Sequence, residues 1–444
     1  MKNLTEGKPI NLILSLAIPM LIGNIFQQIY NVVDTVVVGR YLGEEALAGV
    51  GSTGTLTGVL LAFVYGLGTG AGLIIAQAFG KQAKKELNDT IVALTITSFL
   101  FSLVVTGIGF FAVKPLLVFL KVPDESIEYA LPYLRIMFIF CFASVAYNAS
   151  SGILRSLGDS KTPLFALIIS SFTNIFLDIL FTLYLGFGVR GVAFATIIAQ
   201  VLSCIFNIVN LYRRRNIFGI EDLKPIFNQK YVKKIIKTGF PSAFQSCMIS
   251  LGGLSVQRLI NSFGSSVMAA YVAANKVDSI AIQIVVAIST SLSIYTGQNI
   301  GKGNLKRVKE GLYQTLLIML MACIILAILI PCFRYELMGI FLDEETSTKA
   351  ISIGATYLSI IGIAYIIAGV MNTYLNVIKG AGDVNTCMVA GLTELFGRIL
   401  FAYLLSNYLG FLGIWLATPI SWGCGCIIPV VRYYSGKWKT KTLV

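Results

Sequence analysis

The chain contains no histidine, and only 12% of its 444 residues are charged. Without histidine, it lacks the side chain that most often serves as an acid–base catalyst or a metal ligand. It also has no nucleotide-binding motif, so ATP-driven transport would require a partner chain. These absences predict that the protein is no enzyme and needs no organic cofactor. An ordinary soluble protein is excluded as well, because 56% of the residues are hydrophobic and so few are charged.

Long apolar segments make up most of the chain instead. Segments of about 18 or more mostly apolar residues recur along its length, and each can cross the ~30 Å hydrocarbon layer of a bilayer as a helix. The glycine run "GLGTGAG" (66–72) lies inside one of them and indicates close helix packing. We predict an all-α polytopic membrane protein with twelve transmembrane helices. Their expected limits are 10–38, 47–76, 90–113, 131–154, 163–185, 190–212, 236–262, 267–299, 312–332, 353–378, 386–406 and 411–433.

Lysine and arginine are unevenly distributed between alternate loops. Basic residues gather at 81–85, 213–215 and 302–309 and at both termini, whereas the opposite loops hold few cations and one of them, 343–347, is acidic. By the positive-inside rule, both termini are expected in the cytoplasm and the chain in the cell membrane. Because the net charge of +13 is spread over short segments, we expect the lipid bilayer as a partner and no nucleic acid.

The two halves of the chain repeat the same short motifs. Gln-x-x-Gly-Lys, which starts at Gln77, returns at Gln298, and the Gly-Asp pair that ends at Asp159 returns with Asp383. Each copy covers about six spans, and an even number of spans gives both copies the same orientation, with a cavity between them. Such a two-lobed fold is typical of alternating-access transporters, which is an argument from fold analogy.

The repeat predicts three parts of the chain. We expect an N-lobe of six helices with the cation site (1–212), a basic cytoplasmic linker (213–237) and a C-lobe of six helices (238–444).

Asp34 lies in the middle of the first apolar segment. A charged side chain there is costly and by default marks a functional site in a membrane protein. Further polar residues follow at helical spacing on four of the first six spans. They are Gln27, Tyr30, Asn31 and Asp34 on the first span, Asn148 on the fourth, Ser170, Asn174 and Asp178 on the fifth, and Thr196 and Gln200 on the sixth.

Two carboxylates with amide and hydroxyl oxygens suit a hard monovalent cation or a proton. No basic residue on these spans is placed to neutralise Asp34 or Asp178, so the pair is stable when it is protonated or holds Na⁺. The residues predicted to couple H⁺ or Na⁺ are Asp34, Asn148, Asn174, Asp178 and Thr196, while Gln27, Tyr30, Asn31 and Gln200 are candidates for cavity lining or gating. For Asn148, Gln27 and Gln200, hydrogen bonds between helices are an equally good explanation.

The second half lacks this set of residues. Opposite Asn174 and Asp178 it has Arg398 and Ala402. Glu394 precedes Arg398 by four residues, so the two can neutralise each other on one helix face. We favour a structural ion pair over a second proton site.

Lys276 and Asp278 form the other charged pair in the second half. Two residues apart on one helix, they cannot share a face, so a self-contained pair is not expected. We expect both side chains to line a cavity or to act in gating.

These residues and motifs resemble the multidrug and toxic compound extrusion (MATE) transporters. The first helix "PMLIGNIFQQIYNVVDTVVVG" and the two Gln-x-x-Gly motifs are similar to those of the family, and the resemblance runs from about Ile10 to Tyr434. Within the family, the sequence looks most like the DinF-like bacterial branch, whose N-lobe cation site matches the five coupling residues above in type and spacing. The NorM-like branch has acidic residues on the seventh and tenth helices too, and this chain has none there, which argues against a C-lobe cation site.

The resemblance implies two pseudo-symmetric six-helix bundles of the MATE/MOP type. It also implies export of amphipathic, often cationic organic compounds in exchange for H⁺ or Na⁺. We expect a monomer.

Two alternatives stay open. One is a lipid-linked precursor flippase of the same superfamily, which would need a cationic cavity. The other, from a different class, is an intramembrane enzyme or receptor, which the missing catalytic motifs disfavour.

Overall fold

The computed structural model describes all residues except 1–2, 120–121, 221–227 and 343–346. The described residues form helices and connecting loops, without a strand. Among them, ten helices are long and apolar enough to cross a membrane, and the bent pair α5–α6 would be an eleventh. The predicted class, an all-α polytopic membrane protein, is confirmed. The acidic loop at 343–346 and residues 221–227 of the predicted linker lie outside the described residues.

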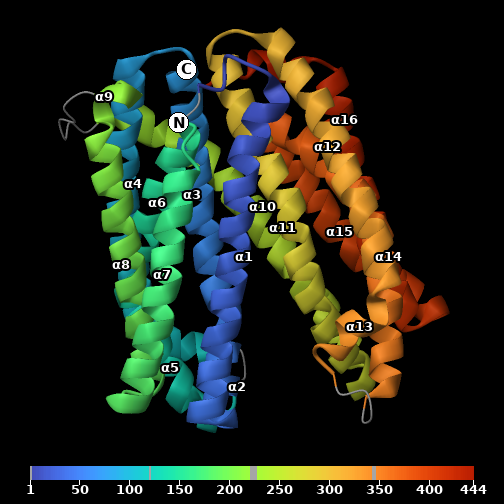
Figure 1. Ribbon diagram of the computed structural model, residues 1–444. Coiled ribbons are helices and arrows are strands. Elements are labelled where there is room, and N and C mark those ends of the chain that lie inside the picture. Colours follow the sequence, from blue (N-terminus) through green and yellow to red (C-terminus); the bar gives the residue numbers. More distant parts are fainter. Residues whose placement is uncertain (1–2, 120–121, 221–227, 343–346) are drawn as a thin grey trace. The chain divides into compact units, whose positions relative to one another are not determined.

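The chain divides into two compact units, which we call unit 1 (1–3, 22–243 and 444) and unit 2 (4–21 and 244–443). In chain order, the helices begin with α1 (Pro9–Leu42), α2 (Glu44–Ser52), α3 (Gly54–Gly80), α4 (Lys84–Phe119), α5 (Asp124–Ile139), α6 (Cys141–Ser156), α7 (Lys161–Ile179), the π-helical turn η1 (Leu180–Tyr184), α8 (Val189–Arg213), α9 (Arg215–Phe218) and α10 (Gln229–Asn261). Those that follow are α11 (Ser265–Gly301), α12 (Leu305–Cys332), α13 (Arg334–Gly339), α14 (Thr348–Gly380), α15 (Val384–Leu409), α16 (Phe411–Tyr434) and the 3₁₀ turn η2 (Lys437–Thr440) (Figure 1).

Two helices are shared between the units, at equivalent places in the repeat. The boundary within α1 falls after Leu21, and the boundary within α10 falls after Ala243. Each lies two residues beyond a proline inside the helix, Pro19 or Pro241. Proline removes one backbone hydrogen bond and clashes with the preceding turn, so both helices are locally weakened where they pass from one unit to the other. The predicted limits of the lobes and the linker stay a prediction.

The fourth predicted span (131–154) consists of two helices. α5 and α6 meet at Phe140 with a bend of 51°. The hydroxyl of Thr106 on α4 donates to the carbonyl oxygens of Phe138 and Ile139, at 3.1 and 3.2 Å, and so satisfies acceptors that the break leaves at the end of α5. The second predicted span also begins later than expected, because α2 and α3 are separate helices that meet at Thr53.

The glycine run on α3 packs against the first part of α10, within unit 1. A Cβ atom added to Gly66 would lie 2.3 Å from that of Ala243, and one added to Gly70 would lie 2.4 Å from the backbone nitrogen of Gly239. Only glycine allows these backbones to approach so closely. The predicted role of the run in helix packing is confirmed.

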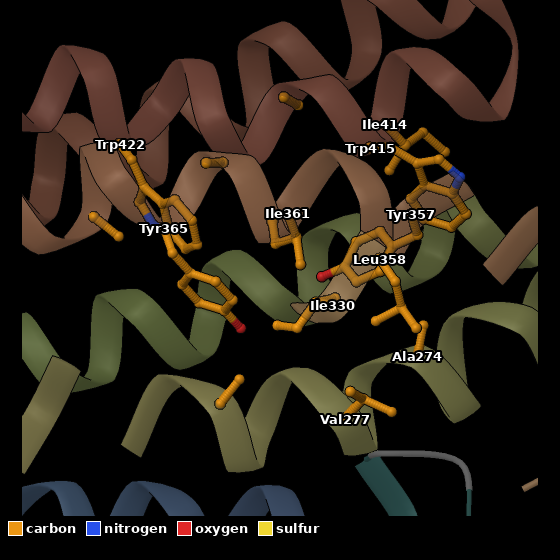
Figure 2. Packing of buried hydrophobic residues seen from close by; sticks show 14 of the residues in the cluster. Ala274, Val277, Ile330, Tyr357, Leu358, Ile361, Tyr365, Ile414, Trp415 and Trp422 are labelled. Carbon is orange, nitrogen blue, oxygen red and sulfur yellow. The ribbon is translucent and has the colours of Figure 1, made fainter. Parts of the chain in front are cut away.

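Aromatic side chains form much of the core of unit 2. Trp415 on α16 stacks on Tyr271 of α11, with ring centroids 5.7 Å apart, and meets Tyr357 of α14 edge to face. Further along the same helices, Trp422 stacks on Tyr365, as Figure 2 shows. This packing fixes Tyr365 beside the polar residues of α11.

Candidate functional site

A cavity of about 370 Å³ opens inside unit 1, between α1, α2, α3, α5, α6, α7 and α8. Most of the polar residues that the sequence predicts for the first half line it: Gln27, Tyr30, Asn31, Asp34, Asn148, Ser170, Asn174, Thr196 and Gln200. Asp178, the second carboxylate of the predicted site, is fully buried next to Asn174. The structure therefore gathers at one cavity side chains that lie up to about 170 residues apart.

Asn174 holds the two acids together. With its amide nitrogen directed toward them, it donates to Asp34 Oδ1 at 2.9 Å and to Asp178 Oδ2 at 3.2 Å. The two carboxyl groups lie close enough to interact with each other. Two ionised carboxylates at close range repel each other, so the pair is suited to hold a proton or a cation.

The sixth predicted span supplies the remaining polar contact. Thr196 on α8 lies 3.4 Å from the side-chain amide of Asn174, and the Tyr30 hydroxyl of α1 is its neighbour. The four predicted residues Asp34, Asn174, Asp178 and Thr196 thus form one connected group on α1, α7 and α8.

The local backbone changes directly after Asp178. α7 ends at Ile179 and continues as the π-helical turn η1, whose wider turns occur frequently at functional sites. Asp178 Oδ1 and the Thr182 hydroxyl are buried, and neither has a hydrogen-bond partner among the described residues. A carboxylate oxygen that has no partner and lies among other oxygen-bearing side chains is suited to bind a proton or a small hard cation.

The cavity carries negative charge without compensation. No lysine or arginine of the described chain is among the residues that line it. Arg135 is exposed and does not line the cavity. In a low-dielectric surrounding, the charge of the two acids can therefore be balanced only by something that enters the cavity.

Four tyrosines line the cavity, and the sequence reasoning singled out only Tyr30. Tyr133 from α5 lies near both Asp34 and Asp178, while Tyr65 and Tyr147 form other parts of the wall. These residues were missed because tyrosine in an apolar segment is usually core. The signal that could have found Tyr133 is its position on α5 four residues after Tyr129, which puts both tyrosines on one face of the helix.

Two of the ambiguous polar residues make hydrogen bonds to α6. Asn148 donates to the Ser144 carbonyl oxygen of its own helix at 2.8 Å, and Gln200 accepts from the Ser144 hydroxyl at 2.5 Å. Both side chains line the cavity as well, so a role in the site and a role in structural hydrogen bonding both stay open for them.

The charged residues of unit 2 are arranged differently. Glu394 Oε1 accepts from Arg398 at 2.8 Å and from the indole nitrogen of Trp422 at 3.2 Å. The side chains of the ion pair are largely buried: that of Glu394 is 9% exposed and that of Arg398 is 15% exposed. The acid is thus neutralised within its own helix, as the i,i+4 spacing predicts.

Asp278 and Lys276 on α11 do not pair with each other through any contact described. The Tyr365 hydroxyl donates to both the carboxylate and the backbone carbonyl of Asp278, while Lys276 is exposed. The prediction that these residues line a cavity or act in gating stays a prediction.

A family model, MatE, matches residues 19–180 and again residues 241–404. The two matches cover well over half of the chain, one in each half. The chain belongs to the MatE family. It is therefore a multi-pass membrane transporter and not an enzyme, and the repeat found in the sequence is confirmed.

Similar proteins cover the chain almost from end to end. The probable multidrug resistance proteins YoeA and YpnP of Bacillus subtilis (strain 168) are each 28% identical to it over 441 residues. These matches cover 96% and 99% of this chain and 93% and 98% of the relatives. A protein described as an FAD transporter, from Shewanella oneidensis, is 23% identical over 95% of this chain and 93% of its own.

Solved structures confirm the fold of MATE transporters. A crystal structure of MATE in complex with MaL6 matches with a TM-score of 0.92, and an outward-facing multidrug resistance MATE transporter of the MOP superfamily with 0.91. Each is 24% identical in sequence and is matched over 99% of both chains.

Proposed function

We propose that the protein is a secondary active antiporter that exports amphipathic, often cationic organic compounds in exchange for H⁺ or Na⁺. The observation that carries this proposal is the acid pair Asp34–Asp178, held by Asn174 in a cavity that no lysine or arginine of the described chain lines. The names of YoeA and YpnP as probable multidrug resistance proteins support the same substrate class.

The cavity has the chemistry that an organic cation needs. Its volume of about 370 Å³ is within the range of small-molecule sites. Tyrosine rings attract cations through their faces, and the two acids supply the compensating charge. The lipid-linked precursor flippase, which would bind a pyrophosphate group, is poorly matched by an acidic cavity.

We infer that ion and substrate compete for the same carboxylates. When a proton or Na⁺ occupies the acid pair, the cavity loses the charge that holds a cationic substrate. When the ion leaves, the charge returns and substrate can bind from the other side by alternating access. Coupling arises because each ligand binds a state that the other disfavours. Pro19, near the boundary within α1, is where we expect this helix to bend.

The test is export of a fluorescent organic cation from proteoliposomes under an imposed pH gradient or an imposed Na⁺ gradient, applied separately. Wild type should respond to at least one of the gradients, and Asp34→Asn and Asp178→Asn should respond to neither. Asp124→Asn, an exposed acid in the first turn of α5, is the matched control and should transport like wild type. Wild-type export by both site variants would refute the coupling site, and no response of wild type to either gradient would refute antiport.

A further inference from the structure

A second cavity lies in unit 2, far along the chain from the acid pair. It is a groove of about 560 Å³ between the first turns of α15, the last turns of α16 and the C-terminal segment. Basic and apolar residues both line it. We call Arg432, Lys437 and Lys441 its basic rim, and Val389, Ile427 and Val431 its apolar wall. The proposed antiport uses none of these residues.

The rim carries uncompensated positive charge. Arg432 Nε donates to Asp383 Oδ2 at 2.6 Å, so these two charges cancel. Lys437 and Lys441 form no ion pair with any side chain in the described part of the chain. Two positive charges therefore face the groove, at the end of the helices that the positive-inside rule assigns to the cytoplasm.

The lysines are held in place by a folded C-terminal segment. Trp438, only 3% exposed, stacks on Tyr433 with ring centroids 5.3 Å apart and donates its indole N–H to the Tyr433 carbonyl oxygen at 2.9 Å. Beyond it, the Lys441 carbonyl oxygen lies against Gly382, where an added Cβ would be 2.4 Å away. Gly382 also has φ +100°, so both the close approach of the Lys441 carbonyl oxygen and the backbone conformation require glycine there. The segment that carries both lysines is thus anchored.

The apolar wall of the groove consists of exposed side chains. Val389, Ile427 and Val431 have exposed fractions of 46%, 62% and 62%. On helices of a membrane transporter, exposed apolar side chains of this kind are suited to contact with acyl chains. A groove lined both by basic residues and by such a wall matches a ligand that is anionic at one end and apolar along its length.

We propose that this groove binds an anionic phospholipid of the cytoplasmic leaflet. Its phosphate lies between Lys437 and Lys441, and one acyl chain runs along Val389, Ile427 and Val431. Basic pockets between transmembrane helices on the cytoplasmic side are known to suit anionic headgroups. A soluble phosphate would satisfy the lysines and leave the apolar wall uncovered, and charge complementarity disfavours a zwitterionic lipid.

The experiment uses the full-length protein, purified in detergent and mixed with equal amounts of dioleoyl phosphatidylglycerol and dioleoyl phosphatidylcholine. Native mass spectrometry then measures the ratio of the two lipids that stay bound. Wild type should prefer the anionic lipid, and Lys437→Gln and Lys441→Gln should each lower that preference about fivefold, with the double variant lower still.

The matched control is the double variant Lys306→Gln/Lys439→Gln. It removes the same charge from exposed lysines that do not line the groove, and it should keep the wild-type ratio. Ile427→Ser should lower retention of both lipids, because it acts on the wall.

Three outcomes would overturn the proposal. They are an equal effect of the two double variants, no anionic preference in wild type, and displacement of the lipid by excess inorganic phosphate, which would indicate a simple anion site. Size-exclusion profiles check that the variants are folded, and the two single variants keep the test decisive if the double variant is not.

Discussion

Units 1 and 2 derive from one repeat, yet they handle buried carboxylates in opposite ways. In unit 1, Asp34 and Asp178 both accept a hydrogen bond from Asn174, and no lysine or arginine of the described chain lines their cavity. In unit 2, Glu394 is neutralised by Arg398 on the same helix. The difference teaches that a repeat can preserve helix packing while it reassigns charge. One unit keeps a site that must take up an ion, and the other has an acid that is already paired.

The largest effect is expected from the acid pair. Asp178→Asn removes the charge that a coupling ion balances, so gradient-driven export should fall to background. Glu336→Gln, at an exposed acid of α13 in unit 2, should stay within about twofold of wild type. Export of a fluorescent cation from proteoliposomes measures both. An equal loss in the two variants would mean that the units do not differ in the way we describe.

The paired acid of unit 2 should matter for stability. Glu394→Gln leaves Arg398 buried without its partner, and we expect the protein to lose roughly 3 kcal/mol of stability. Thermal unfolding in detergent should show a lower midpoint. The double variant Glu394→Gln/Arg398→Met should recover most of the loss, because no unpaired charge remains. If the double variant is no more stable than the single one, the pair does not act as a self-contained unit.

The hydroxyl of Thr196 should affect ion coupling more weakly. Thr196→Val removes the contact with Asn174 and a polar neighbour of Tyr30, and we expect the concentration of coupling ion needed for half-maximal export to rise about tenfold. Thr97→Val on α4 is the control, because that hydroxyl donates to the Ala93 carbonyl oxygen of its own helix. A tenfold change in the control as well would point to general destabilisation.

The smallest effect is expected at a residue found only through the structure. Tyr133→Phe keeps the ring and removes the hydroxyl beside the two acids, so the KM for an organic cation should change about threefold at an unchanged kcat. Tyr271→Phe, a tyrosine of the aromatic core of unit 2, should leave KM unchanged. A larger shift in Tyr271→Phe would place substrate contacts in unit 2 and weaken the contrast between the units.

Much of the fold could be predicted because bilayer thickness imposes long apolar helices, and these are visible in the sequence. The break at Phe140 could not, because it depends on Thr106 of another helix to satisfy the freed carbonyl oxygens. The boundaries within α1 and α10 were also invisible in the sequence, since a continuous helix gives no sign of which unit each part packs against.

Asp34, Asn174, Asp178 and Thr196 stand out in the sequence because charged and polar groups inside apolar spans are costly and so need a reason. The sequence by itself therefore determined the membrane fold, the twofold repeat and the chemical nature of the candidate site. Only the tertiary structure decided that Asn174 bridges the two acids, that Tyr133 lies beside them and that the C-terminal lysines frame a groove. These are contacts between distant segments, and helical periodicity reports only which residues share a face of one helix, not which face of another helix they meet.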